Sequence, residues 1–256
     1  MIECTIAESV AEIVLNNPSA NTFTSEGLDA LLELIAKLNG NAQVRAAVIT
    51  GAGEKFFSAG ADLKQFADGD KVRARAVVQR FGATFEALQT ARPVTIAAIN
   101  GFAMGGGLEC ALACDMRICE EQAQMALPEP SVGLLPAGCG TQTLPWLVGE
   151  GWAKRMILTN ERVNAETALR IGLVEQVVPR GQARASAMEI AKRVATLSPK
   201  AVTYSKSLIH QAREGTARHV ALCVERERFV DLFDGEDQRE GVNAFLEKRK
   251  PAWRGS

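Results

Sequence analysis

In the first half of the chain, segments with the apolar pattern of a β-strand alternate with segments whose apolar residues recur at helical spacing. Residues 2–16 alternate in places and predict two short strands. Thr24 or Ser25 caps a predicted helix that ends near position 40, and its apolar side recurs at positions 28, 31, 32, 35 and 38. The apolar run 46–50 predicts a buried strand, and helical spacing returns over residues 70–90. The apolar side of this second helix would comprise Val72, Val77, Phe81, Phe85 and Leu88.

The alternation continues to about residue 130 and then gives way to helices. Residues 93–100 predict a buried strand, 107–114 a helix and 116–119 another strand. Strands that alternate with helices are typical of an α/β fold, in which helices cover a parallel sheet. The later segments with helical spacing are 151–158, 165–171, 181–196, 199–213, 216–233 and 238–248, and residues 172–178 are predicted to be extended.

The composition is sufficient for one sizeable hydrophobic core. The chain has 256 residues, of which 47% are apolar and 23% are charged. We predict an α/β core over residues 1–195 and a C-terminal helical region over residues 196–256 that is suited to packing on a neighbouring subunit.

The charge balance and the cysteines argue against several classes of protein. Lys and Arg number 29 against 30 Asp and Glu, a net charge of -1, so no nucleic-acid partner is predicted. No basic segment leads into a long apolar run, so we expect a cytoplasmic protein without a membrane segment. The six cysteines form no CxxC pair, and neither of the two histidines lies near them. This argues against a zinc site and fits thiols in a reducing compartment.

The sequence argues against three common functional motifs. Gly51 and Gly53 follow a predicted strand, but Phe56 stands where a dinucleotide-binding fingerprint needs its third glycine. No Walker phosphate-binding loop is present. His210 and His219 both fall in the late helical region, which disfavours a Ser-His-Asp triad. Any chemistry should therefore depend on carboxylates, backbone amides or a thiol.

Two glycine-containing loops are candidates for binding an anion or a developing oxyanion. Gly105–Gly107 run directly into an apolar helical segment, and Ser58–Asp62 forms a second loop after a strand. Glycine lets backbone amides approach a ligand closely, and a helix start offers unpaired N–H groups and the positive end of its dipole. If the loops face each other, they supply two N–H donors to one carbonyl oxygen. Each loop alone could equally be a tight turn.

Two glutamates stand out by their surroundings. Glu109 lies inside the apolar segment that follows the glycines, and Glu129 lies between two prolines in a rigid loop. A loop glutamate is usually a solvated charge. Two carboxylates in one apolar cleft, however, could share general acid and base work on a water molecule.

Four motifs occur in order along the chain. They are FSAGADLK at 57–64, AINGFAMGGGLE at 98–109, Pro128-Glu129 with Gly133, and FLEKR at 245–249 followed by Pro251. In residue type and spacing they resemble the crotonase (enoyl-CoA hydratase/isomerase) superfamily over essentially the whole chain. The resemblance implies a spiral of repeated ββα units with a C-terminal helical region used for trimer assembly, and trimers that often pair into hexamers.

The resemblance also implies an acyl-CoA thioester as the substrate. The amides of Ala61 and Gly106 would hold the thioester oxygen in an oxyanion hole. Glu109 would position and deprotonate the water that attacks C3, and Glu129 would deliver a proton to C2. The implied reaction is syn hydration of a 2-trans-enoyl-CoA to a 3-hydroxyacyl-CoA, with no metal or redox cofactor. The residues implied to bind the substrate are Ala59, Gly60, Ala61, Asp62, Leu63, Lys64, Gly105, Gly106 and Lys248.

The sequence departs from the family pattern at two places. The early loop carries Pro18–Ala20 where many relatives have a basic residue, which removes one expected phosphate contact. Ala137 stands where many hydratases have a glycine next to the catalytic water, which affects the expected water geometry. Phe66, Phe81 and Phe85 could limit the acyl chain or belong simply to the core.

Two other functions remain open at this point. A Δ3-Δ2-enoyl-CoA isomerase would use Glu129 alone to shuttle a proton. A non-catalytic acyl-CoA-binding or scaffold protein would keep the fold without turnover.

Overall fold

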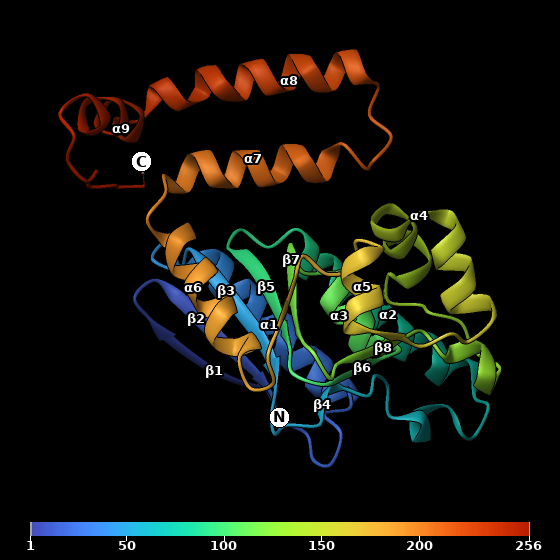
Figure 1. The fold of residues 1–256 in the computed structure, drawn as a ribbon. Coiled ribbons are helices and arrows are strands. Elements are labelled where there is room, and N and C mark those ends of the chain that lie inside the picture. Colours follow the sequence, from blue (N-terminus) through green and yellow to red (C-terminus); the bar gives the residue numbers. More distant parts are fainter. Residues whose placement is uncertain (1, 256) are drawn as a thin grey trace.

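The computed structural model describes residues 2–255 and is built on a six-stranded sheet (Figure 1). Its strand order is β1 (Ile2–Ala7), β2 (Val10–Leu15), β3 (Ala46–Gly51), β5 (Val94–Ile99), β7 (Met116–Glu120) and β10 (Gln176–Val178). β1 is antiparallel to β2, and the other pairs are parallel. Every residue of β3 and β5 is buried, because both faces of the sheet are covered.

A smaller sheet lies beside the first and completes the repeating unit. Its strand order is β4 (Phe56–Ser58), β6 (Phe102–Met104), β8 (Gln124–Ala126) and β9 (Val163–Asn164), with only β9 antiparallel. Three times in succession the chain contributes a strand to the large sheet, a short strand to the small sheet, and then a helix. This arrangement confirms the predicted spiral of ββα units.

Helices cover both faces of the large sheet. The helices of the core are α1 (Ser25–Gly40), α2 (Lys71–Gln89), α3 (Gly106–Leu112), α4 (Gly140–Leu158), α5 (Ala165–Arg170) and α6 (Ala183–Ala195), with 3-10 turns at η1 (Leu63–Phe66) and η2 (Glu129–Val132). The Thr24 side chain caps α1 as predicted, since it accepts the N–H of Gly27. On the opposite face, α6 packs its buried alanines against β3 and β5.

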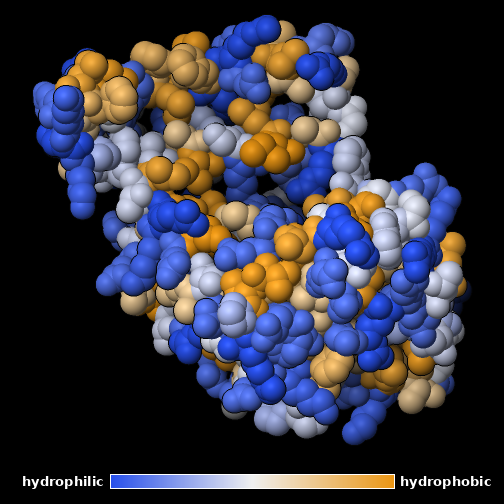
Figure 2. All heavy atoms as spheres, viewed as in Figure 1, coloured by the Kyte–Doolittle hydropathy of each residue, from blue (hydrophilic) through white to orange (hydrophobic). Residues whose placement is uncertain are grey.

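The C-terminal helices form a layer that extends beyond one end of the core (orange to red in Figure 1). They are α7 (Pro199–Gln211), α8 (Arg218–Asp231) and α9 (Glu236–Leu246), with η3 (Leu232–Asp234) before α9. The predicted division after residue 195 falls between α6 and α7. Large apolar side chains on this layer are exposed, namely Ile209, Val220, Phe229, Val230, Phe233, Val242, Phe245 and Leu246. Figure 2 shows hydrophobic residues on these helices and on the part of the core that faces them.

Three sequence-based expectations differ from the structure. The helix predicted over 151–158 begins at Gly140, and it contains Pro145 and a non-helical Gly149 that obscure the helical pattern. Val72 is 79% exposed, because it lies in the first turn of α2, before that helix reaches the core. Of the predicted extended segment 172–178, only the last three residues form a strand. No helix within residues 2–255 is both long and apolar enough to cross a bilayer.

Candidate active site

A cavity of about 790 Å³ opens at the N-terminal end of α3. It brings together most of the residues that the sequence singles out: Ala59, Ala61, Asp62, Leu63, Gly105, Gly106, Glu109 and Glu129. Gly60 does not line the cavity itself but packs against the backbone of Gly106, which does. Lys64 and Lys248 do not line the cavity. The remaining wall is largely apolar and includes Phe66, Val78, Phe81, Val132, Leu134 and Leu135.

Two backbone N–H groups lie next to each other at the cavity wall. Gly106 is the first residue of α3, so its N–H has no acceptor within the helix. Ala61 and Phe23 form a parallel β-bridge. Its two hydrogen bonds join Phe23 to the neighbours of Ala61: the Phe23 N–H donates to the carbonyl of residue 60, and the N–H of residue 62 donates to the Phe23 carbonyl. The N–H of Ala61 itself therefore points away from Phe23. A β carbon built on Gly106 would lie 3.6 Å from Ala61 N. Neither N–H has an acceptor among residues 2–255, so both can bind a ligand oxygen.

Two glycines are required for this close approach. Gly60 has a φ of +85°, and a β carbon there would lie 2.8 Å from Gly106 N. Gly105 has a φ of +53°, and a β carbon there would lie 2.7 Å from Glu129 Oε1. A residue with a side chain would be strained at these positive φ angles, and its β carbon would displace the loop or the glutamate.

Glu109 is held by three backbone amides. It lies in the first turn of α3 and is only 3% exposed. Its Oε1 accepts the N–H groups of Gly138, Cys139 and Gly140 at 2.8, 2.8 and 2.7 Å. Burial raises the pKa of Glu109, and these three hydrogen bonds oppose that rise by stabilising the carboxylate. Its Oε2 accepts no hydrogen bond within the described part of the chain and remains available to a water or a substrate.

Glu129 is in a different environment on the other side of the same cavity. Its Oε2 is buried and has no hydrogen-bond partner among residues 2–255. Burial, and to a lesser extent the charge of Glu109, raises the pKa of Glu129 to about 7. The two carboxyl groups therefore differ in their surroundings: three amides stabilise the carboxylate of Glu109 against the effect of burial, whereas Glu129 Oε2 has no hydrogen-bond donor among residues 2–255. Such a pair can supply one base and one acid near neutral pH.

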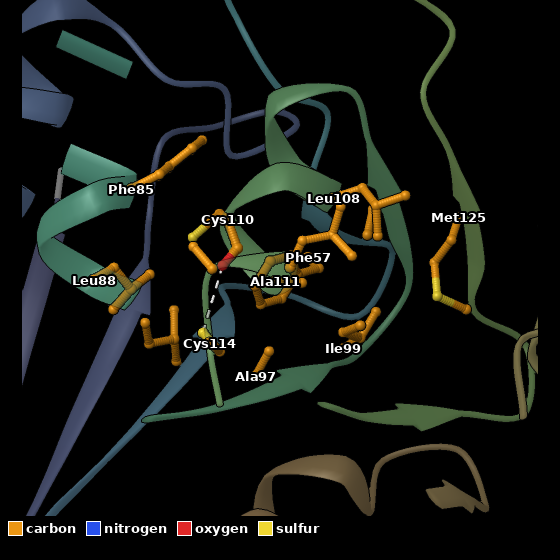
Figure 3. Packing of buried hydrophobic residues seen from close by; sticks show 14 of the residues in the cluster. Phe57, Phe85, Leu88, Ala97, Ile99, Leu108, Cys110, Ala111, Cys114 and Met125 are labelled. Carbon is orange, nitrogen blue, oxygen red and sulfur yellow. Dashed lines mark hydrogen bonds between the residues drawn. The ribbon is translucent and has the colours of Figure 1, made fainter. Parts of the chain in front are cut away.

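The packing around α3 fixes the position of Glu109. Leu108, Cys110 and Ala111 are fully buried, and Figure 3 shows them among the buried side chains of α2 and the strands. Phe85 lies in this layer and makes edge-on contacts with Phe81 and Phe23. Because α3 is closely packed on several sides, Glu109 cannot shift with the helix unless the core also rearranges.

The sequence of the chain matches known proteins over nearly its whole length. A family model described as enoyl-CoA hydratase/isomerase matches residues 5–256. The chain belongs to this family. It is 38% identical to the short-chain-enoyl-CoA hydratase of Clostridium acetobutylicum, over 94% of this chain and 92% of that protein.

Solved structures of similar proteins share the crotonase fold of this family member. The structure of Pseudomonas aeruginosa DspI is 63% identical, with a TM-score of 0.97 over 99% of this chain and 96% of that one. The enoyl-CoA hydratase of Bacillus anthracis is 38% identical, with a TM-score of 0.96 over 100% of this chain and 99% of that one.

The structure also adds residues that the sequence analysis missed. The amides of Gly138–Gly140 contribute through their backbone, which side-chain patterns do not reveal. The glycines on either side of Cys139, at the start of a helix, are the one signal that could have indicated them. Of the three phenylalanines considered for the acyl pocket, Phe66 and Phe81 line the cavity, whereas Phe85 belongs to the core behind it. In this family member, the predicted contacts of Lys64 and Lys248 with CoA stay predictions.

Proposed function

We propose that this member of the enoyl-CoA hydratase/isomerase family adds water to a 2-trans-enoyl-CoA and yields a 3-hydroxyacyl-CoA. The observation that carries the proposal is the shared cavity, in which Glu109 and Glu129 lie with the two free amides of Ala61 and Gly106. A hydratase needs a base for water, an acid for C2 and donors for the thioester oxygen, and these groups supply all three.

The two amides would bind the thioester oxygen. When water adds at C3, negative charge develops on this oxygen as the enolate forms. The N–H groups of Ala61 and Gly106 are already in place, and Gly106 also begins α3, so the positive end of the helix dipole favours the same charge. Loss of one such donor typically lowers kcat about 10²–10³-fold.

The glutamates would divide the proton transfers. Glu109, whose carboxylate is supported by three amides, takes a proton from water as the water oxygen bonds to C3. Glu129, whose pKa is raised to about 7, gives its proton to C2. The C2–C3 double bond becomes a single bond, and exchange with solvent then restores both glutamates. No metal or redox group is required for these steps.

The isomerase remains the second candidate, because Glu129 has a buried oxygen with no hydrogen-bond partner among residues 2–255, and this oxygen could move a proton between C4 and C2. Loss of the ultraviolet absorbance of crotonyl-CoA distinguishes the two functions, with Glu109→Gln and Glu129→Gln measured alongside. Hydration that both variants abolish supports the hydratase. An isomerase would leave crotonyl-CoA unchanged and convert 3-enoyl-CoA even with Glu109→Gln. Binding of acyl-CoA without turnover of either substrate would indicate a non-catalytic protein.

We also propose that the chain assembles as a trimer or as a hexamer of paired trimers in the cytoplasm. The exposed apolar side chains on α7–α9 support this assembly, since their burial between subunits would remove them from water. Lys248 would then reach the CoA phosphates of a neighbouring subunit. Sedimentation should give three or six times the chain mass of 27.5 kDa, and Lys248→Ala should raise KM and leave kcat unchanged.

A further inference from the structure

Cys139 connects the start of α4 with the helix that carries Glu109. It lies directly before α4, and its backbone N–H is the middle one of the three amides on Glu109 Oε1. We propose that the Cys139 side chain is a positioning residue, which aims these three amides at Glu109 and thereby sets the orientation and acidity of that carboxyl group. The proposal rests on the proposed hydratase function.

The thiol forms a contact that the amides alone do not provide. Cys139 Sγ donates to the backbone carbonyl of Glu109 at 3.3 Å. The same carbonyl accepts the N–H of Ala113, the residue that caps the C-terminus of α3. One residue therefore holds Glu109 at two points, its side-chain Oε1 and its main-chain oxygen. The amide binds the carboxylate directly, and the thiol ties Cys139 to the main chain of the helix that carries Glu109, so the amides and the carboxylate keep a fixed relative position.

The thiol is well suited to this role because it stays protonated. Burial, and next the charge of Glu109, raises the pKa of Cys139 to about 12. The neutral S–H is a weak donor and adds no second negative charge beside Glu109. The other ionisable groups near this region are Glu129 and two buried thiols, and burial raises the pKa values of Cys110 and Cys114 as well. Among these neighbours within residues 2–255, Glu129, whose pKa is raised to about 7, is expected to change charge near neutral pH.

Thr143 connects Cys139 to a third helix. One turn into α4, it donates its backbone N–H to the Cys139 carbonyl at 2.8 Å. Thr143 Oγ1 in turn accepts Gln89 Nε2 of α2 at 3.0 Å. Cys139 is therefore the point at which α2, α3 and α4 are joined by polar contacts behind the cavity.

Loss of the thiol should affect catalysis more than binding. With Oε1 occupied by three amides, Oε2 is the oxygen left to orient water. If the amides shift, the carboxylate loses stabilisation, so the pKa of Glu109 rises and the water is held less well. Ala61 lies on a separate segment, and the Gly106 N–H lies at the start of α3, three residues before Glu109, so we expect thioester binding to change less than the Glu109 carboxylate does.

The test compares Cys139→Ala with Cys139→Ser and with Cys119→Ala as a matched control. Cys119 is a fully buried thiol on β7 and does not line the cavity. Cys139→Ala should lower kcat about tenfold with KM within about twofold, because a misplaced catalytic group costs rate rather than binding. It should also move the acidic limb of the kcat profile to higher pH. Cys139→Ser, which keeps a donor, should recover most of kcat and return the limb toward wild type. Cys119→Ala should change none of these values.

A second readout does not require turnover. An infrared titration of the carboxyl band that disappears in Glu109→Gln reports the pKa of Glu109 directly. A higher value in Cys139→Ala than in wild type supports the positioning role, even if the wild type hydrates no enoyl-CoA and the proposed function is wrong. An unchanged infrared titration, an alanine variant with wild-type kcat, or a serine variant no better than alanine would overturn the proposal.

Discussion

Glu129→Gln should make the protein more stable at alkaline pH while it removes the proposed acid. The folded protein raises the pKa of Glu129 from an ordinary value of 4.5 to about 7, chiefly by burial. The folded state thus favours the protonated carboxyl group. The stability associated with this group is fully present below pH 4.5 and is lost as the pH rises through about 7. Glutamine cannot ionise, so the variant should retain that stability.

The size of the effect follows from the shift. A change from 4.5 to about 7 corresponds to about 3 kcal/mol at 1.36 kcal/mol for each pKa unit. The carboxyl group faces an open cavity, so screening by water should reduce the measured gain to roughly 1.5–2 kcal/mol. Relief of the repulsion between the two glutamates is included in this figure, because the charge of Glu109 is one cause of the raised pKa.

Urea denaturation from pH 4 to pH 9 at one protein concentration measures this difference. The midpoints of Glu129→Gln and wild type should nearly coincide at pH 4, separate between about pH 4.5 and 7, and keep a constant difference at higher pH, with the variant more stable. Glu33→Gln on the exposed side of α1 removes the same charge from the surface and serves as the control. A constant offset between Glu129→Gln and wild type at all pH values, or a gain equal to that of Glu33→Gln, would refute the reasoning.

Three further predictions concern activity. The rate of hydration should fall as the pH rises above about 7, because Glu129 must carry its proton to donate it; a rate that still rises to pH 9 would contradict this. Gly105→Ala should lower kcat/KM about 100-fold or more in the crotonyl-CoA assay, since its β carbon would meet Glu129 Oε1 at 2.7 Å on a strained backbone. Phe66→Ala should shift the preference toward longer enoyl-CoA chains by enlarging the cavity wall, whereas an unchanged ratio of kcat/KM between C4 and C10 substrates would place Phe66 outside the acyl path.

The strong periodic elements of the fold could be predicted from the sequence. The helix over 25–40 and the strands β3 and β5 are long enough, and apolar enough, to give an unambiguous pattern. The strands of the small sheet are two or three residues long, so periodicity cannot define them. The first half of α4 was missed because Pro145 and Gly149 are residues that normally end helices. Short strands and broken helices depend on contacts with distant segments, which a local pattern does not contain.

The candidate site was predictable where residue type matters and unpredictable where backbone geometry matters. Glu109 and Glu129 could be selected by their surroundings and by the family motifs, and both line the cavity. The amides of Gly138–Gly140 could not, since an N–H group carries no sequence signature. The structure also shows why one residue type can be assigned two roles. Glu109 faces three donors, whereas Glu129 Oε2 faces none within the described residues.

This asymmetry links the stability of the protein to its proposed chemistry. An unpaired buried oxygen is unfavourable for folding, and a polar partner for Glu129 Oε2 would relieve it. Such a partner would also stabilise the carboxylate, lower its pKa and weaken it as a proton donor. The three amides on Glu109 have the opposite effect: they stabilise its carboxylate, and a general base must be deprotonated to accept a proton from water. The surroundings that destabilise one glutamate and support the other are therefore the same surroundings that allow both to act at one pH.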